Sequence, residues 1–376
     1  RFPYSSLFRS ILASLYHAHG RYGDAEPLSV EALSIRREVL GERHPDVADS
    51  FNSLAQLYQV QGKTAQMLRT FQRGLDIEEW NLELNLTTLT DAQRQNYVTT
   101  LTSSTSIAIS FSLQAAEAQL LGLTTLLLRK RLLLDSDVAF LQQLRQNLTP
   151  SEQKNLDDFI AVRQQLATVT FNPPNSLPQE QYRVQLSQQE TQANNLEKTL
   201  AQRSAVFRAE TQPVDIALVK AQIPTDGVLV EYVRYQPFDA KANFANRWGE
   251  ARYAAYLLSP EGDLTAVALG PAIDIDTAVL SLASTLEDPS QQIDEIPHRA
   301  QTLHDLVMAP LRRHLDGAEH LLISPDSALN QIPFEVVRSD DQYLVEAFEI
   351  SYLNSGRDLV KLDLIPPSHN PAVILA

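Results

Sequence analysis

The sequence predicts an α + α/β protein, in which N-terminal helical pairs and a long helical spacer precede a layered α/β region with a mostly parallel sheet. Three observations support this order. A helical motif recurs after 42 residues near the N-terminus, and Gly is nearly absent between about residues 80 and 215. After Thr225, short β-prone segments alternate with helical ones. We therefore expect three parts, 1–80, 81–214 and 215–376, which suits a chain of this length.

The first part contains an internal repeat. The segment ILASLYHAHGRYGDA begins at Ile11, and SLAQLYQVQGKTAQM begins at Ser53. In an α-helix the shared Leu, Ala and Tyr lie on one face, and the shared Gly follows where a left-handed residue ends the helix. Each unit therefore predicts a helical hairpin. The matched pairs are Leu12 and Leu54, Ala13 and Ala55, Tyr16 and Tyr58, and Gly20 and Gly62.

The second unit departs from the first at two positions. Met67 and Gly74 stand where the first unit has Ala25 and Ala32, which indicates that the array is ending. Two units alone bury little surface, so we expect further repeats before Arg1. The first residue is not Met and the last residues form an apolar run. We interpret both ends as cut from a longer chain.

This repeat resembles the 42-residue variety of tetratricopeptide repeat found in kinesin light chains. The resemblance rests on the L-A-x-x-Y…G core and on the linker LG-x-x-HPDVA. It implies a concave groove that holds a peptide or a partner protein. Asn52 matches a position where such repeats place a peptide-contacting asparagine, although a solvated polar residue is the alternative interpretation. Tyr16 and Tyr58 are the other candidates for partner contact.

The middle part predicts a long antiparallel helical hairpin, with its turn at NPPNSLP, residues 172–178. The most apolar stretch, residues 120–134, contains Arg129, Lys130 and Arg131. It is too short and too charged to span a bilayer, so we interpret it as a helix packed in a core. The whole part is expected to be a structural spacer rather than a separate binding site.

Composition excludes several classes of protein. The formal net charge is −15, which disfavours a general nucleic-acid binder because such a protein needs a basic face. The chain has no Cys, which excludes disulfides, thiolate metal sites and a cysteine nucleophile within these residues. No signal-peptide pattern and no glycine-rich nucleotide loop is present. We expect a cytoplasmic protein with no cofactor, no direct nucleic-acid contact and no membrane segment.

The last part predicts an α/β domain. Helices are expected from about Asp276 and over 297–315, where Pro310 should bend or split the second helix. The first strand is apolar except for Glu231 and Arg234, which interrupt its pattern. The predicted strands are 228–235, 253–259, 265–270, 320–324, 348–353 and 372–376.

No metal site is predicted in this part. His298, His304 and His314 are six and ten residues apart, so they do not share a helical face as a pair of metal ligands would. The segment SGRD, 355–358, could form an anion-binding nest. We favour the start of a helix capped by Ser355.

The stretch LLISPDSALNQIPFEVV, residues 321–337, resembles an active-site turn at first sight. A hydrolase built on Ser324 or Ser327 would need a placed His and an oxyanion donor, and the sequence indicates neither. We interpret the segment as a buried strand followed by a turn that the Asp326 side chain braces.

Several phrases of this part resemble, in order, the N-terminal half of the CHAT domain, a caspase-like domain associated with tetratricopeptide repeats. The phrases are LVEYVRY (229–235), LHDLVMAPL (303–311), LLISPDSALNQIPFEVV (321–337), YLVEAFEISYLNSGRDLV (343–360) and PAVILA (371–376). The resemblance covers roughly residues 215–376. It implies the first half of a caspase-like α/β/α domain.

The resemblance also implies a cysteine peptidase of the clan of caspases and separases, with a His–Cys dyad. In that family both residues lie downstream of the strand that PAVILA matches, so no catalytic residue is assigned to this chain and the fragment alone is expected to be inactive. Ser327 departs from the family, which usually has Gly after Pro-Asp at this point.

Two functions stay open at this stage. The chain is part of a CHAT-domain cysteine peptidase that protein partners regulate through the repeats, with an unknown protein substrate. The alternative is a non-catalytic scaffold for protein–protein interaction, with a degenerate CHAT domain.

Overall fold

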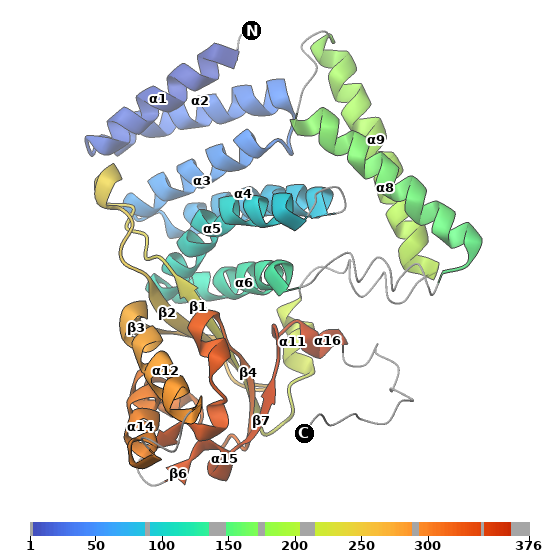
Figure 1. The fold of residues 1–376 in the computed structure, drawn as a ribbon. Coiled ribbons are helices and arrows are strands. Elements are labelled where there is room, and N and C mark those ends of the chain that lie inside the picture. The colour runs from blue at the N-terminus through green and yellow to red at the C-terminus, as the bar shows by residue number, and fades with distance from the viewer. Residues whose placement is uncertain are drawn as a thin grey trace.

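The computed structural model describes residues 3–86, 91–134, 148–171, 177–203, 215–287, 293–339 and 342–361. Figure 1 shows a stack of helices that leads from the N-terminus to an α/β region, with a separate helical hairpin beside the stack. Within the described residues, no helix is both long enough and apolar enough to cross a membrane.

The N-terminal helices form the two predicted hairpins. The first joins α1 (Pro3–Ala18) to α2 (Tyr22–Leu40), and the second joins α3 (Pro45–Val60) to α4 (Thr64–Leu86). Gly20 and Gly62 follow α1 and α3 with φ of +71° and +72°, the left-handed conformation that favours glycine. At the start of α3, the His44 ring accepts a hydrogen bond from the backbone N–H of Asp46.

One face of α1 remains apolar and exposed. Leu7, Phe8, Ile11 and Leu15 are each at least half exposed. Their counterparts 42 residues later all line the cavity between the two hairpins, namely Asp49, Ser50, Ser53 and Leu57. The exposed face of α1 is therefore the one by which a repeat of this array faces its predecessor. Further repeats before Arg1 stay a prediction.

The spacer contains two structural units. Helices α5 (Asp91–Gln114) and α6 (Gln119–Leu134), joined by the short helix η1 (Ala116–Ala118), continue the stack under α4. Helices α8 (Pro150–Phe171) and α9 (Gln179–Arg203) form the predicted hairpin, and most of its predicted turn lies outside the described residues. This hairpin packs against the repeats through a small apolar cluster that includes Leu84, Val162 and Leu166.

The α/β region contains one main sheet, in the order β3–β2–β1–β4–β7. β4 and β7 are parallel to β1, whereas β2 is antiparallel to both β1 and β3. The α + α/β class is confirmed, but the sheet is mixed rather than mostly parallel. The strands are β1 (Gly227–Tyr235), β2 (Arg252–Leu258), β3 (Thr265–Pro271), β4 (His320–Ser324) and β7 (Glu349–Tyr352), and β5 (Arg338–Ser339) with β6 (Gln342–Tyr343) makes a separate pair.

Burial explains why the direction of β2 is hard to predict. Its run of apolar residues is covered on both faces, which is typical of parallel strands. However, no crossover helix joins β1 to β2, so the chain returns antiparallel. The predicted strand 372–376 lies outside the described residues.

Helices cover both faces of the sheet. One face packs on α12 (Ala272–Glu287) and α14 (Ile296–Val307) through β1 residues such as Val230 and Tyr232. The other face, reached by Leu229 and Val233, packs on α5, α6, α11 (Ile216–Ala221) and α16 (Asp358–Lys361). The spacer therefore supplies one layer of the α/β sandwich, which its interpretation as a simple spacer did not foresee. The boundaries 1–80, 81–214 and 215–376 stay a proposal.

Local breaks in the last part follow the sequence signals. Helix α14 ends at Val307, and the 3-10 helix η4 (Ala309–His314) replaces it around Pro310. Ser355 precedes the start of α16, and its Oγ accepts from the N–H of Arg357 at 3.4 Å. The remaining short elements are η2 (Phe244–Asn246), η3 (Ile293–Glu295), η5 (Ser327–Gln331), η6 (Phe334–Val336) and α15 (Leu344–Ala347).

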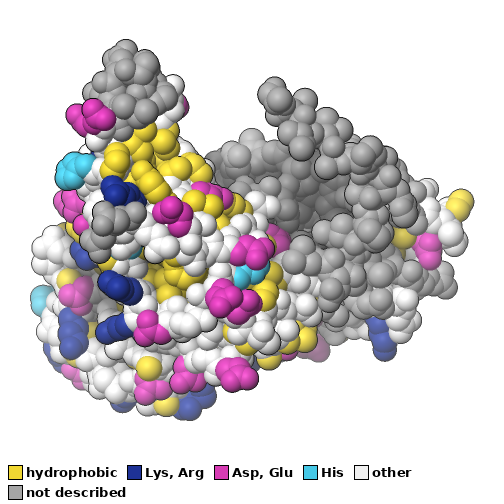
Figure 2. All heavy atoms as spheres, turned by 90° about the horizontal axis from the view of Figure 1, so that it is seen from below, with side chains coloured by type: hydrophobic (Ala, Val, Ile, Leu, Met, Phe, Trp, Pro, Cys, Tyr) yellow, Lys and Arg dark blue, Asp and Glu magenta, His cyan; other side chains and the backbone are white. Residues whose placement is uncertain are grey.

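The surface of the α/β region mixes charges of both signs. On the face shown in Figure 2, Lys and Arg side chains are interspersed with Asp and Glu, and the described part of this face forms no continuous basic area. Across the described residues, no group of three or more His, Asp or Glu side chains gathers in a way that could hold a metal ion.

Candidate functional site

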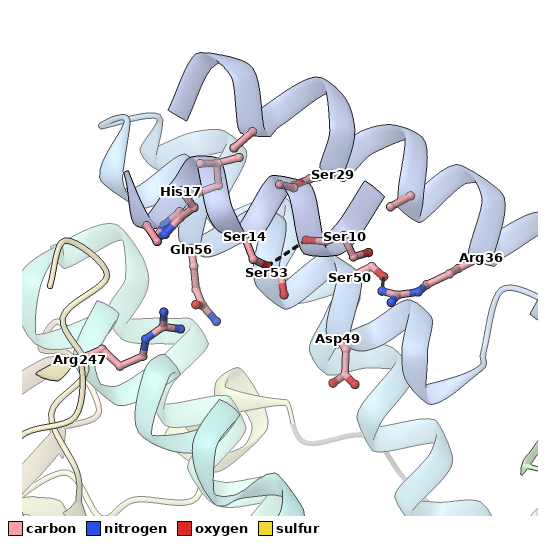
Figure 3. Close-up of a pocket in the computed structure, with 15 residues that line it drawn as sticks. Ser10, Ser14, His17, Ser29, Arg36, Asp49, Ser50, Ser53, Gln56 and Arg247 are labelled. Carbon is pink, nitrogen blue, oxygen red and sulfur yellow. Dashed lines mark hydrogen bonds between the residues drawn. The ribbon is translucent and has the colours of Figure 1, made fainter. Parts of the chain in front are cut away.

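The repeats enclose a groove of about 340 Å³ between α1, α2 and α3. Figure 3 shows Ser and Ala side chains along its walls, with His17, Arg36, Asp49 and Gln56 among the polar groups around it. A further wall residue, Arg247, comes from the segment between β1 and β2 rather than from the repeats. The α/β region thus contributes directly to the groove of the repeats.

The three residues predicted to bind a partner lie outside this groove lining. Tyr16 is half-buried under the Arg21 guanidinium, which lies 4.3 Å from the ring centroid. Tyr58 is buried, and its ring carries the Lys63 ammonium at 5.5 Å. Asn52 is only 7% exposed. Partner binding at these residues stays a prediction.

Sequence reasoning missed the residues that do line the groove. The available signal was a polar stripe on α3, where Asp49, Ser53 and Gln56 are spaced i, i+4 and i+7 and therefore share one helical face. The prediction relied on the apolar and glycine positions that define the repeat, and this stripe is not among them. The contribution of Arg247 had no local signal.

Asn52 has a structural contact that explains the departure at Gly74. The Asn52 Nδ2 donates to Glu78 Oε1 at 2.6 Å across the α3–α4 contact. A Cβ on Gly74 would lie 2.1 Å from Asn52 Oδ1 and 3.3 Å from the carbonyl oxygen of Ala48. Gly74 therefore makes room for the Asn52 side chain. The loss of Ala at this position therefore has a packing explanation, and the end of the array after this unit stays a prediction.

We expect Gly74→Ala to destabilise the protein by about 1–3 kcal/mol, although Ala has the higher helix propensity. The new methyl group would displace Asn52 from Glu78. Gly23→Ala is the matched control, because no atom lies within 4 Å of the added Cβ there. That change should be neutral or stabilising by up to about 1 kcal/mol. Urea denaturation of both variants checks the pair, and equal effects would contradict the packing argument.

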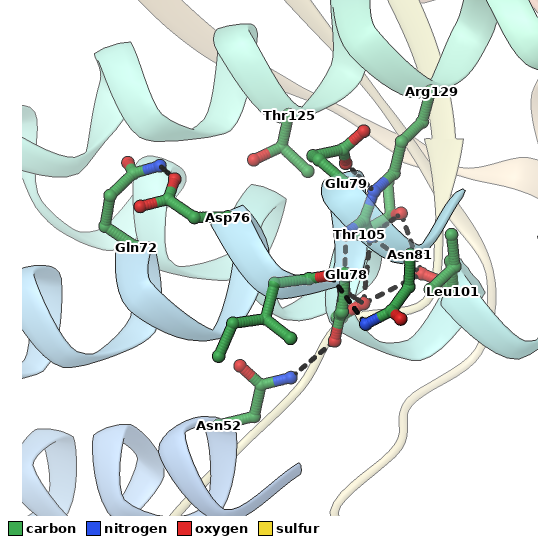
Figure 4. A network of polar contacts seen from close by, with 12 residues as sticks. Asn52, Gln72, Asp76, Glu78, Glu79, Asn81, Leu101, Thr105, Thr125 and Arg129 are labelled. Atoms are coloured by element: carbon green, nitrogen blue, oxygen red, sulfur yellow. Dashed lines mark hydrogen bonds and ion pairs between the residues drawn. The ribbon is translucent and has the colours of Figure 1, made fainter. Parts of the chain in front are cut away.

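Arg129 of α6 ties the spacer to the repeats. Figure 4 shows its guanidinium reaching the carboxylates of Glu78 and Glu79 on α4. Its Nε lies 2.9 Å from Glu79 Oε1, and the Arg129 side chain is 5% exposed. Further N–H groups donate to Leu101 O, Ser104 Oγ and Thr105 Oγ1 at 3.0, 2.8 and 2.7 Å. Because Glu78 also accepts from Asn52, these contacts connect α3, α4, α5 and α6.

The charges of this cluster respond to burial and to each other. Burial alone would lower the pKa of Arg129, but the carboxylates of Glu78 and Glu79 outweigh it and raise that pKa. Burial raises the pKa of Glu79, and the Arg129 guanidinium limits the rise. The positive charge of Arg129 therefore offsets the repulsion between these two neighbouring carboxylates.

Lys130, the next residue of α6, ties the spacer to the sheet. Its Nζ donates to Glu231 Oε1 and to Ser324 Oγ, each at 2.7 Å. The Lys130 side chain is 6% exposed and Glu231 of β1 is completely buried. Glu231 Oε2 accepts from the backbone N–H of Gly356 at 2.8 Å. This buried pair thus joins the middle of β1, the end of β4 and the segment after β7.

Arg129 and Lys130 project to different sides because consecutive helical residues are about 100° apart. One contacts the last helix of the repeats and the other contacts the sheet. A further contact joins the same layers, since Ser112 Oγ of α5 and Tyr256 OH of β2 lie 2.6 Å apart. The α5–α6 pair is therefore held by polar contacts on both sides.

Comparison with protein-family models identifies both ends of the chain. Residues 6–79 match the tetratricopeptide repeat, and residues 297–376 match the CHAT domain. The chain combines tetratricopeptide repeats with a CHAT domain. No curated protein and no solved structure matches it. The CHAT match begins at α14, whereas β1, β2 and β3 precede it and belong to the same sheet.

The turn after β4 of the CHAT domain is structural in this chain. Ser324 Oγ is buried and occupied, because it donates to Glu231 Oε1 at 2.7 Å and accepts from Lys130. The Asp326 carboxylate accepts from the backbone N–H of Arg234 at 2.7 Å. Asp326 therefore braces the turn as predicted, and a substrate carbonyl could not reach Ser324.

Ser327 occupies a strained backbone position in this turn. Its φ is +52°, the left-handed conformation that favours glycine. We expect Ser327→Gly to stabilise the protein by up to about 1 kcal/mol by removing this strain. Ser187→Gly, an exposed position inside α9, should instead destabilise by roughly 0.5–1 kcal/mol. Thermal unfolding separates the two, and a loss of stability in both would contradict the strain argument.

Proposed function

We propose that the chain is part of a CHAT-domain cysteine peptidase that protein partners regulate through the tetratricopeptide repeats. Peptide-bond hydrolysis would use a His–Cys dyad located downstream of this chain. The observation that supports this proposal best is the position of α6, whose adjacent residues Arg129 and Lys130 contact the repeats and the CHAT sheet.

The contacts of α6 give a physical route for regulation. Energetic coupling between two sites needs an element whose arrangement both sites influence. A partner in the groove contacts α3, which reaches Arg129 through Asn52 and Glu78. Lys130 on the same helix contacts Glu231 and the end of β4. A shift of α6 would change both sets of contacts together.

The test uses the full-length protein and a thiol-reactive peptide probe. We expect labelling of one downstream Cys, and we expect Arg129→Met to change the labelling rate because it breaks the link to the repeats. The control is Arg37→Met, which removes an exposed pair with Glu42. Equal labelling in both variants would oppose the coupling. A sequence after Ala376 that lacks a His followed by a Cys would oppose the peptidase.

The second candidate is a non-catalytic scaffold. The groove favours it in one respect, because its described lining residues need no catalytic group to offer a binding surface. In that case the probe would label no single Cys, while partner binding would persist. Labelling that depends on one Cys would exclude the scaffold.

A cytoplasmic location belongs to the same proposal. Cell fractionation of the full-length protein checks it, with enrichment in the membrane or the secreted fraction as the contrary result.

A further inference from the structure

We infer that the repeat groove is a composite site in which Arg247 of the β1–β2 hairpin binds a carboxylate-bearing peptide segment of the partner. The inference rests on the proposed function in that it names the chemistry of the partner that the repeats would sense. A residue of the α/β region would then contact the ligand directly.

The hairpin that carries Arg247 is fixed against the helical stack. Phe238 and Trp248 form an antiparallel bridge, and their ring centroids are 4.9 Å apart. Phe238 is buried among residues of α3, α4 and α5, and its backbone N–H donates to Ser110 Oγ at 2.9 Å. The Arg247 carbonyl accepts from the N–H of Asp239 at 2.8 Å. Arg247 is therefore presented to the groove by an ordered segment.

The Arg247 side chain lies at one end of the groove. Figure 3 shows its guanidinium on the same side as His17 and Gln56. The guanidinium carbon is 6.0 Å from the centroid of the Phe238 ring, so the ring lies next to the guanidinium. The His17 Nε2 is buried and makes no hydrogen bond within the described residues. A ligand oxygen at this end would meet a guanidinium and an imidazole.

The electrostatics of this end favour an anion. Burial lowers the pKa of Arg247. Burial lowers the pKa of His17, and the positive charge of Arg247 lowers it further, so the two groups interact electrostatically. A carboxylate bound here would pair with the partly buried guanidinium, and hydrogen bonds between charged groups are the strong ones.

The other end of the groove has a different character. Burial and the negative charges of Glu78 and Asp46 raise the pKa of Asp49, so an anion is disfavoured beside it. Arg36 lies near Asp49, but its Nη1 already donates to Ser50 Oγ. The Asp49 end therefore holds an acid beside a cation, whereas the described lining residues at the Arg247 end include no acid, so a bound segment would place its carboxylate at the Arg247 end.

The size and surroundings of the groove fit a short peptide segment. A volume of about 340 Å³ lies within the usual range for ligand sites, and small Ser and Ala side chains leave the walls open. The chain as a whole carries a net charge of −15. This negative charge would repel an acidic partner at long range, so binding would depend on the local positive charge of Arg247.

Contact with Arg247 would have a direct consequence for the CHAT domain. The hairpin continues into β1 and β2, and β1 carries Glu231, the partner of Lys130. A ligand that holds Arg247 against α1 and α3 would therefore bridge the repeats and the sheet without passing through α6.

The experiment measures binding alone. An array of octapeptides presents Asp, Glu, Asn, Gln or Lys at one central position in varied neutral surroundings, and fluorescence anisotropy gives affinities for the retained peptides. We expect Asp and Glu peptides to be retained and to bind about tenfold more weakly to Arg247→Ala. Arg247→Glu should prefer the Lys peptides. The control Lys241→Ala changes an exposed cation of the same hairpin and should leave binding unchanged.

The outcomes separate this inference from the proposed function. Retention of no peptide, retention without an acidic preference, or wild-type affinity in Arg247→Ala would each overturn the inference. Arg247→Gln, close in length, replaces the Ala variant if thermal unfolding shows that the latter does not fold. Acidic peptides that bind through Arg247 but leave labelling of a downstream Cys unchanged would sustain this site and count against the regulated peptidase.

Discussion

Replacing Lys130 by Met is expected to destabilise the folded protein by about 3–5 kcal/mol. The variant keeps the length and apolar stem of the side chain but removes its charge. Glu231 would then be buried with hydrogen bonds from Ser324 and Gly356 and without a cation. An uncompensated buried carboxylate is among the most unfavourable groups in a protein core. Urea denaturation followed by circular dichroism measures the change.

An exposed ion pair is the matched control for Lys130. Glu31→Gln removes the partner of Arg9, and these two side chains are 58% and 36% exposed. We expect a loss of no more than about 1 kcal/mol there. The double variant Lys130→Met with Glu231→Leu should recover much of the loss, because removing both charges of a buried pair is often neutral. A small effect of Lys130→Met alone would show that water reaches Glu231.

Local physics explains what the sequence could predict. The helical hairpins follow from the spacing of Leu12, Ala13 and Tyr16, and their ends follow from glycine at positive φ. The break at Pro310 and the turn braced by Asp326 also depend on neighbouring residues only. Signals of this kind act within a few residues of one another, so a single sequence contains them.

The contacts that join the parts of the chain could not be predicted in the same way. Glu231 interrupts an apolar strand and Lys130 interrupts an apolar helix, and each looked like a defect in its own segment. They are 101 residues apart and form one buried pair. The available signal was that the two interruptions carry opposite charges. No local signal favours Lys130 over its neighbours as the partner of Glu231, since Arg129 and Arg131 flank it.

The same reasoning applies to the candidate site. Sequence reasoning placed a partner site in the first repeats, but it selected Asn52, whose amide is buried against Glu78. The polar residues that line the groove occupy the neighbouring face of the same helix. Arg247 enters from a hairpin nearly 200 residues further along the chain, so only the tertiary structure brings it to the groove.

Replacing Arg129 by Met is expected to cost about 3–5 kcal/mol, and the cost should grow with pH. The guanidinium pairs with both Glu78 and Glu79, so its loss leaves a buried and a largely buried carboxylate side by side without a cation. At low pH, protonation would relieve this repulsion. At neutral pH the cost would persist. Either both carboxylates stay charged beside each other, or one of them has to stay protonated.

The sign of the pH dependence follows from Glu79. Burial raises its pKa above the ordinary 4.5, so the folded protein holds this proton more tightly than the unfolded chain does. The stability linked to that proton is present below the unfolded pKa and is lost as pH rises through the folded pKa. Arg129 limits the rise, so Arg129→Met raises the pKa of Glu79 further. The loss then extends to higher pH.

Urea denaturation at about pH 5 and about pH 8 tests this expectation. Arg129→Met should be more destabilised, relative to the wild type, at the higher pH. Adding Glu79→Gln removes the titrating group, so the double variant should lose most of that pH dependence and recover stability at the higher pH. A penalty for Arg129→Met that is equal at both pH values would mean that lost packing and hydrogen bonds, rather than the two carboxylates, set the cost. In that case the α4–α6 contact would be held by shape, and the charge-based link between the repeats and the spacer would have to be abandoned.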